Sequence, residues 1–226
     1  MAKLAAQGDI VNCRRCPRLV EYREDVARTK VRRFCDWDYW GRPVPSLGPT
    51  DAQLLIVGLA PAAHGGNRTG RIFTGDRSGD WLYRALYHFG FANQPRSTDR
   101  KDGLQLIDSY ITAAIHCAPP DNKPLPSEFK NCRPYLLEEL QRLKKVRVVV
   151  ALGFIAFKNY FAARKELGMV NPSPLPSFGH SLSAALPDGM TLISSYHPSQ
   201  QNTQTGKLTE SMLDAVFSQA RTLLES

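Results

Sequence analysis

The sequence predicts an α/β fold with a central parallel sheet. Four short runs are almost entirely apolar, as expected for strands that are buried on both faces of such a sheet. These runs are QLLIVGL at 53–59, YITAAI at 110–115, RVVVAL at 147–152 and TLISSY at 191–196. Segments with helical periodicity lie between and after them, and strands that alternate with helices are typical of parallel α/β sheets.

Four helices are predicted from apolar residues that recur on one face. The first, Asp80–Phe89, has Ser78 as its candidate N-cap and Gly90 as its candidate stop. The other three cover Ser127–Leu143, Phe154–Lys165 and Leu208–Leu224. The proline-rich segments 118–126 and 171–178 are predicted loops.

The composition is that of a soluble globular domain with a basic surface. The chain has 226 residues, of which 42% are hydrophobic and 22% are charged, and its formal net charge is +8. Such a charge suits a protein that binds polyanions, although many proteins are basic for solubility alone. No apolar run approaches the ~18 residues of a membrane span, and residues 1–12 lack the apolar core of a signal peptide. We therefore expect one domain, residues 1–226, in the cytosol.

Four cysteines have the spacing of a metal site. Cys13 and Cys16 form a C-x2-C pair, and Cys117 and Cys132 form a second, distant pair that flanks a proline-rich loop. Four thiolates can hold either an iron–sulfur cluster or a structural zinc ion. The fifth, Cys35, is predicted to be a small buried hydrophobe outside the site. Residues 1–48 would form a cluster-binding extension that packs on the α/β core.

The loops that follow three of the predicted strands carry unusual residues, and in parallel sheets ligands bind at this edge. The loop 58–76 has glycines that let backbone N–H groups approach an anion, but it matches neither a P-loop nor a dinucleotide fingerprint. His197 directly follows the last strand and could hydrogen-bond to a developing anion. In the loop after the second strand, the amide of Asn122 could donate to and accept from a base edge, or simply belong to a turn.

The sequence resembles the uracil-DNA glycosylase superfamily, and most closely its iron–sulfur, B-type branch, known as family 5. The resemblance rests on GLAPAAHGGNRTGRIFTGD at 58–76, HCAPPDNKPLP at 116–126, SYHPSQQNTQTGKLT at 195–209 and the four cysteines. It implies a three-layer α/β/α sandwich with a four-stranded parallel sheet and a [4Fe-4S] cluster. It also implies a DNA repair enzyme that flips uracil, hypoxanthine or, as a further candidate, xanthine out of DNA and hydrolyses its glycosidic bond.

The resemblance assigns roles to particular residues. Phe73 would stack on the base, Asn122 would bind its edge, and His197 would stabilise the departing base. Gly58, Ala60 and His64 would complete the substrate pocket. DNA would be bound by the loop residues Asn67, Arg68, Thr69 and Arg71 and by Ser199, Gln200, Asn202, Thr205 and Lys207, with the 199–203 loop entering the DNA as the base leaves.

The sequence departs from the wider superfamily at two places. Leu59 and Ala60 stand where many relatives have an acidic or amide side chain before a proline, and Ala113 stands where many have an asparagine. Both departures are typical of the B-type branch and leave more room for purines. They also remove the usual water-activating group, and our hypothesis is that Asp76 takes over this electrostatic or water-positioning work.

Two alternatives remain at this stage: a non-catalytic nucleic-acid-binding protein with a structural zinc, and a small-molecule redox enzyme that uses the cluster. The first does not explain Phe73, Asp76 and His197 at strand ends, and no flavin or nicotinamide fingerprint supports the second. The resemblance favours a monomeric, prokaryotic protein associated with the nucleoid. Its cluster is expected to be structural and to brace the loop that carries Asn122, because Cys117 and Cys132 bracket that loop.

Overall fold

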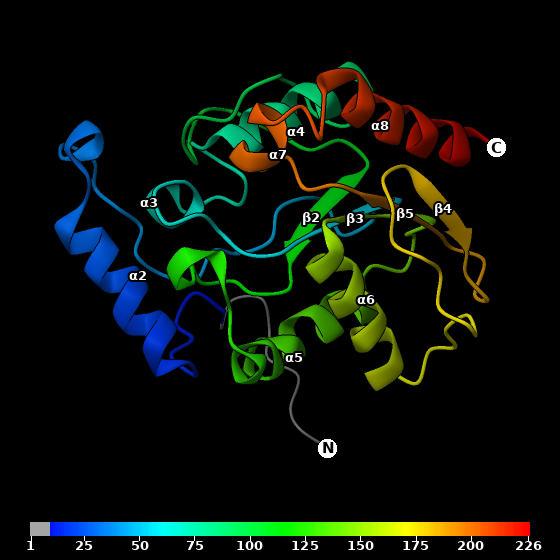
Figure 1. Ribbon diagram of the computed structural model, residues 1–226, viewed down its shortest axis with the longest axis horizontal. Coiled ribbons are helices and arrows are strands. Elements are labelled where there is room, and N and C mark those ends of the chain that lie inside the picture. The colour runs from blue at the N-terminus through cyan, green and yellow to red at the C-terminus, as the bar shows by residue number, and fades with distance from the viewer. Residues whose placement is uncertain (1–9) are drawn as a thin grey trace.

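A five-stranded sheet in the order β2-β1-β3-β5-β4 lies at the centre of the fold (Figure 1). The computed structural model describes residues 10–226. Four strands are parallel, namely β1 (Leu54–Gly58), β2 (Ser109–Ala113), β3 (Val148–Leu152) and β5 (Thr191–Ser195). They coincide with the four apolar runs, so the predicted parallel sheet is confirmed.

The fifth strand, β4 (Leu182–Ala185), was not predicted. It pairs with β5 in the antiparallel direction at the edge of the sheet. Its residues are mostly exposed, whereas every residue of β1, β2 and β3 is buried. A short exposed edge strand has no continuous apolar run, and the predicted count of four strands is therefore corrected to five.

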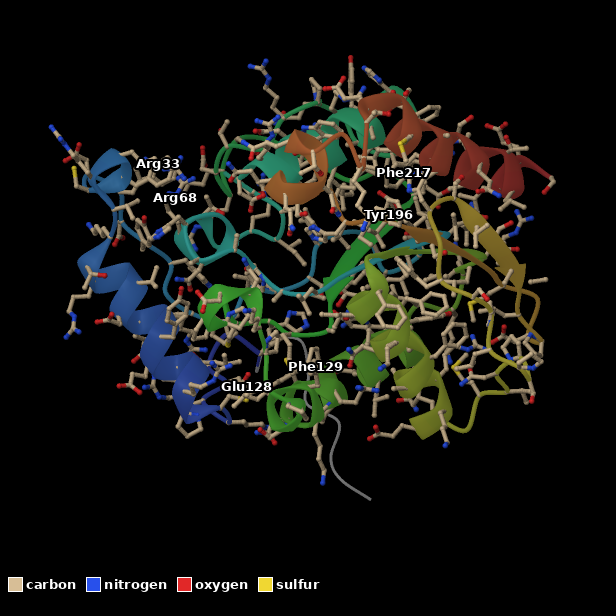
Figure 2. All side chains as sticks on the ribbon, viewed as in Figure 1. Arg33, Arg68, Glu128, Phe129, Tyr196 and Phe217 are labelled. Carbon is tan, nitrogen blue, oxygen red and sulfur yellow. The ribbon has the colours of Figure 1, made fainter. Side chains whose placement is uncertain are left out.

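Helices cover both faces of the sheet, which confirms the three-layer sandwich (Figure 1). On one face, α4 (Arg77–His88) and α8 (Glu210–Glu225) pack with Leu54 and Ile56 of β1. Phe217, labelled in Figure 2, is fully buried on this side. On the other face, α6 (Phe154–Glu166) packs with Leu55 and Val57 of β1, and α5 (Pro126–Arg142) packs against α6. Alternate residues of one strand thus supply two separate cores.

The ends of the helices lie close to their predicted positions, with one correction. The N-cap of α4 is Asp76 rather than Ser78, and its Oδ1 accepts a hydrogen bond of 2.9 Å from the N–H of Gly79. Gly90, with a φ of +72°, follows the end of this helix as predicted. Asp76, the residue that was expected to stabilise charge or position water in the site, is therefore also the N-cap of α4.

The N-terminal segment wraps around one edge of the sheet. It contains α2 (Pro17–Thr29) and the 3-10 turn η1 (Arg32–Phe34), and α2 contacts α3 (Gly66–Thr69) in the loop after β1. Leu47 then forms an antiparallel bridge with Ile111 of β2. This bridge covers the outer edge of β2, which would otherwise expose unpaired backbone groups. Residues 1–9 of the predicted extension lie outside the described residues.

The remaining short elements lie in loops. They are the 3-10 turn η2 (Pro120–Asn122) and the helix α7 (Gln200–Gln204). Within the described residues, no helix combines the length and apolar character needed to cross a bilayer.

Candidate active site

The loops after β1, β2 and β5 meet at the carboxyl edge of the sheet and enclose a cavity of about 530 Å³. We call it the base pocket. Phe73 and Asp76 come from the first loop, Asn122 from the second and His197 from the third. The complete lining is Leu59, Ala60, Ala62, Phe73, Asp76, Arg77, Ser78, Asn122, Ile155, His197, Ser199, Gln200 and Gln201. The four side chains with predicted base or catalytic roles are therefore brought to one place.

Phe73 is held by two glycines. Its φ of +52° is unusual for a residue with a side chain, and its ring is 7% exposed. A Cβ added to Gly58 would lie 2.9 Å from ring atom Cε2, and one added to Gly79 would clash with the Phe73 carbonyl oxygen. The ring stacks on that of His197, with centroids 5.8 Å apart and an interplanar angle of 28°. Gly58 thus shapes the pocket by making room for Phe73.

Asp76 is a partly buried carboxylate at the start of α4. Gly65 packs so closely on it that any side chain at position 65 would overlap the carboxylate. Loss of solvation raises the pKa of Asp76, while hydrogen bonds from the N–H groups of Gly79 and Ser78 oppose this shift. The helix N-terminus therefore helps to keep a poorly solvated carboxylate ionised in the wall of the pocket.

His197 is uncharged in this site at neutral pH. Burial lowers the pKa of its imidazole to about 4. Within residues 10–226, neither ring nitrogen has a hydrogen-bond partner, while the backbone is fixed by Asn202, whose Nδ2 donates to the His197 carbonyl at 2.8 Å. A neutral ring carries one N–H donor and one acceptor. Both are available to a molecule in the base pocket.

Asn122 lies at the rim of the base pocket. It ends the turn η2, where Asp121 and Asn122 have φ values of +52° and +56°. Its N–H donates to the Pro119 carbonyl at 3.2 Å, and its side chain is exposed at the pocket. The sequence allowed two roles for Asn122, as a turn residue or as a group that binds the edge of a base. The two roles are compatible, because the backbone makes the turn while the side-chain amide stays accessible.

His64 and four loop residues lie elsewhere than expected. His64 does not line the base pocket, and its Nδ1 lies 3.2 Å from the Tyr39 hydroxyl. The side chains of Asn67, Arg68, Thr69 and Arg71 are buried, and their polar groups bond mainly within the protein. Most of these donors hold the loop in shape, although Arg68 Nη1 has no hydrogen-bond partner among the described residues, and the four side chains are buried rather than exposed at the surface.

Arg68 shows how this loop is held. Its guanidinium lies between the rings of Phe34 and Trp37, at 3.8 and 4.0 Å from their centroids. It donates to the carbonyls of His64 and Gly75 at 2.7 and 2.9 Å. Figure 2 shows Arg68 beside Arg33 of η1. The N-terminal segment therefore clamps the loop that carries Phe73 and Asp76.

The segment that was expected to enter DNA is helical rather than a loop. Ser199 caps α7 by accepting from the Asn202 N–H at 3.3 Å, and Thr205 donates to the Gln201 carbonyl at 2.8 Å. Ser199 and Gln200 line the base pocket. Asn202 and Lys207 instead line a neighbouring cavity.

Ile155 is a pocket residue that the sequence analysis missed. It follows β3, lines the base pocket and is 43% exposed. The run 147–152 was correctly predicted to be a strand of the parallel sheet, so the rule that ligands bind beyond strand ends also applied to it. The segment was overlooked because it carries no polar side chain before Lys158.

The four predicted metal-ligating cysteines line one small cavity together. Cys13, Cys16, Cys117 and Cys132 surround about 20 Å³ with apolar neighbours such as Leu19 and Ile115. Three N–H donors point at the sulfurs, namely Arg23 Nη1 to Cys117 at 2.9 Å, the His116 N–H to Cys132 at 3.4 Å and Asn131 Nδ2 to Cys16 at 3.5 Å. Donors of this kind suit thiolate ligands of a cluster.

Four cysteine thiols at one cavity are a donor set that either an iron–sulfur cluster or a zinc ion could take. Cys35 is exposed, so the prediction that it is buried was wrong, while its place outside the cavity agrees with expectation.

The state of His197 can be tested by NMR of protein with ¹⁵N-labelled histidine. We expect the ring signals that disappear in His197→Gln to stay those of a neutral imidazole from pH 8 down to pH 5, because burial lowers the pKa to about 4. An ordinary histidine would titrate near pH ~6.5. A midpoint in that range for this ring would contradict the desolvated site.

Comparisons with known proteins agree with this geometry. The model of the uracil DNA glycosylase superfamily matches residues 45–221. A type-5 uracil-DNA glycosylase of Mycobacterium bovis is 50% identical over 212 residues, which cover 93% of this chain and 78% of the relative. Type-5 enzymes of Thermus thermophilus and Pyrobaculum aerophilum are each 47% identical across 93% of this chain, and across 93% and 88% of their own. The chain therefore belongs to the uracil-DNA glycosylase superfamily.

Proposed function

We propose that this protein is a DNA repair glycosylase that hydrolyses the bond between uracil and deoxyribose. The observation that carries the proposal is the convergence of Phe73, Asp76, Asn122 and His197 on one cavity of about 530 Å³. The names of relatives that are 47–50% identical over 93% of this chain support it.

The pocket offers a distinct interaction to each part of a flipped base. A base inside a duplex must leave the stack before an enzyme can reach its glycosidic bond. The Phe73 ring would then pack on the face of the base, and the Asn122 amide would hydrogen-bond to its edge. As the bond breaks, negative charge grows on the base, and the neutral His197 ring would donate its N–H to that charge.

Asp76 would act on the sugar side of the same bond. Glycosidic cleavage passes through an oxocarbenium-like sugar, and a fixed carboxylate stabilises such a cation or positions the attacking water. Asp76 is the only carboxylate among the described residues that line the base pocket. Its raised pKa reflects poor solvation, which strengthens its interaction with a nearby cation.

The same pocket would accept deaminated purines. Leu59 and Ala60 bring no polar group to the wall where many relatives have one, and Ala60 adds only a methyl group. Hypoxanthine, and xanthine as a further candidate, are therefore proposed as additional substrates. DNA would be held by the net charge of +8 together with exposed groups near α7, such as Lys207 and Thr205.

We further propose that the four cysteines hold a [4Fe-4S] cluster. The cluster would supply a structural cross-link and no step of the hydrolysis. Cys13 precedes α2 and Cys16 is its N-cap, whereas Cys117 and Cys132 flank the loop that carries Asn122. A cluster bound by all four would join the N-terminal segment to the wall of the base pocket.

A panel of oligonucleotides tests the activity. We expect wild-type protein, followed by alkali, to cleave strands that contain uracil or hypoxanthine and to leave matched strands with cytosine or adenine intact. Gel electrophoresis of end-labelled strands is the measurement. Binding without cleavage of any modified strand would instead indicate a non-catalytic DNA-binding protein.

The role of Asp76 is tested by Asp76→Asn under single-turnover conditions. Asparagine caps helices about as well as aspartate, so α4 should keep its start while the charge is lost. We expect the rate to fall by roughly 10²–10⁴, the usual contribution of a positioned acid or base. Asp80→Asn is the matched control, because Asp80 lies in the first turn of the same helix and outside the pocket lining. An unchanged rate for Asp76→Asn would remove this residue from the mechanism.

The metal is identified by colour and iron content. Protein purified without oxygen should be brown and contain about four iron atoms per chain, as a single [4Fe-4S] cluster requires. Cys117→Ser should lose most of this iron, whereas Cys35→Ser should keep it, because Cys35 is exposed and lies outside the cavity. Colourless protein with one zinc per chain would contradict the cluster.

A further inference from the structure

A second cavity lies directly beside the base pocket. The two share Leu59, Ile155 and His197, and the second has a volume of about 280 Å³. We call it the side cavity. Its other lining residues are Leu152, Gly153, Phe154, Ala156, Phe178, Tyr196, Asn202 and Lys207. Its volume is near the lower end of ligand pockets, which range over about 300–1,000 Å³, so it suits a small ring rather than a large ligand.

Aromatic rings dominate this cavity. Phe154 is the first residue of α6, and its side chain is 53% exposed. The Phe178 ring supports it edge-on, with centroids 5.5 Å apart, and Phe178 in turn lies 6.3 Å from Tyr196. A half-exposed ring that contacts an aromatic neighbour offers surface on which a base could stack. The neighbouring Ile155 is also exposed, so the apolar surface continues to the rim of the base pocket.

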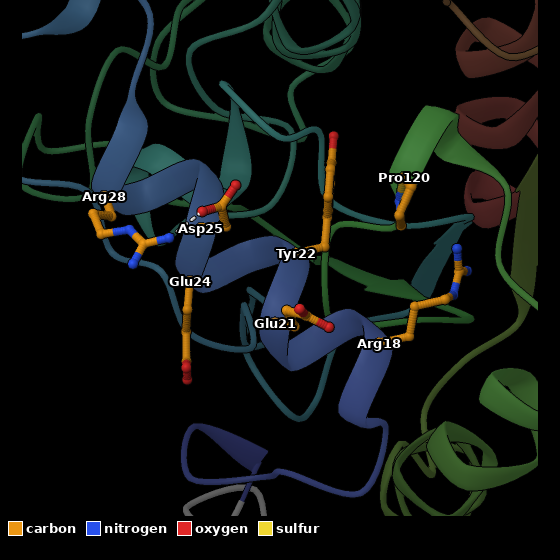
Figure 3. A pocket seen from close by; sticks show the side chains of 7 residues that line it. All are labelled: Arg18, Glu21, Tyr22, Glu24, Asp25, Arg28 and Pro120. Carbon is orange, nitrogen blue, oxygen red and sulfur yellow. Dashed lines mark hydrogen bonds and ion pairs between the residues drawn. The ribbon is translucent and has the colours of Figure 1, made fainter.

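The charges around the platform suit a nucleic-acid strand. Lys158 Nζ lies 5.5 Å from the centroid of Phe154, and Lys207 Nζ lies 4.9 Å from that of Tyr196. None of the described residues that line the side cavity is acidic. The larger hollow along α2, about 770 Å³, is lined by Glu21, Glu24 and Asp25 together with Arg18 and Arg28 (Figure 3). The side cavity instead has Lys207 with no acidic residue among its described lining, so it attracts a phosphate more strongly.

The helix α7 does not provide an apolar surface on which a base could stack. Its residues Gln200–Gln204 are QQNTQ, so it offers no large apolar side chain to bases near the flipped nucleotide. Proteins that disturb base stacking commonly use apolar or aromatic side chains to replace the lost contacts. Phe154 and Ile155 are the exposed apolar side chains that line the two adjoining cavities.

We propose that the side cavity binds the nucleobase next to the target in the same strand, stacked on Phe154, with Lys207 near its phosphate. This inference rests on the proposed glycosylase function. The neighbouring base would be unpaired while it is bound, so the enzyme would favour single-stranded or loosely paired DNA around the damage. Ile155, which lines both cavities, would separate the two bases.

A double-mutant cycle between protein and DNA tests the subsite. The probes are single-stranded oligonucleotides with one 2′-fluoro-deoxyuridine, which resists cleavage, and with a normal or an abasic nucleotide on its 5′ or 3′ side. Phe154→Leu should weaken binding of the normal strand about 5- to 150-fold, the usual range for loss of one base–aromatic stack. With the abasic nucleotide on the stacking side, the variant and the wild type should bind equally.

Two controls make the result specific. Phe154→Tyr keeps the ring and should bind like wild type. Tyr87→Leu removes an aromatic side chain of similar exposure, 46%, from α4 outside both cavities and should also have no effect. Equal losses for Phe154→Leu with normal and abasic neighbours on both sides, or no loss at all, would overturn the subsite. Because wild-type cleavage of a uracil strand is measured in parallel, that failure is distinguishable from failure of the proposed function.

Discussion

The backbone turns sharply at Phe73, and close packing at this turn holds the rest of the pocket in place. The ring of Phe73 fills the space above Gly58, where a side chain on the strand end would otherwise lie. Its carbonyl oxygen fills the space at Gly79, in the first turn of α4. One turn therefore sets the stacking ring, the start of the helix and the position of the capping Asp76. The positive φ of Phe73 costs energy, and such costs persist only where the surrounding packing enforces them.

Desolvation acts in opposite directions on the two titratable groups of the pocket. It lowers the pKa of His197, which leaves a neutral donor and acceptor, and it raises the pKa of Asp76. The N-terminus of α4 offsets part of the second shift through the N–H groups of Gly79 and Ser78. The protein thus keeps a neutral group and supports a charged group in the lining of one pocket. Under the proposed function these two groups would face a departing anionic base and a cationic sugar.

Arg23 links the cysteine cavity to the base pocket. This residue of α2 is 2% exposed and donates to Cys117 Sγ at 2.9 Å. Its carbonyl accepts from Asn67 Nδ2 at 3.1 Å, so the same residue also holds the loop after β1. Together with the Arg68 stack on Phe34 and Trp37, this contact joins the N-terminal segment to two of the three pocket loops. The cluster proposed above would therefore stabilise the pocket through Arg23.

The amino-acid sequence by itself determined the parallel strands, the long helices, the strand-end location of the site and the residues Phe73, Asp76, Asn122 and His197. The strands, the helices and the edge follow from local periodicity and from the rule that parallel strands end at one edge, whereas the roles of Phe73 and Asp76 came from the family resemblance. Tertiary structure alone decided three other matters. It added β4, a four-residue edge strand that is too short and too exposed to show the pattern of a buried strand, and it exposed Ile155 at the base pocket and Phe154 at the side cavity, where apolar residues of a strand–helix junction look like core. It also turned Asn67, Arg68, Thr69 and Arg71 inward, where backbone carbonyls of Arg23, Gly75 and Thr74 accept hydrogen bonds from the first three side chains and the Ser97 hydroxyl accepts one from Arg71. Sequence shows which side chains can bind a phosphate, but only the packed fold shows which of them remain free to do so.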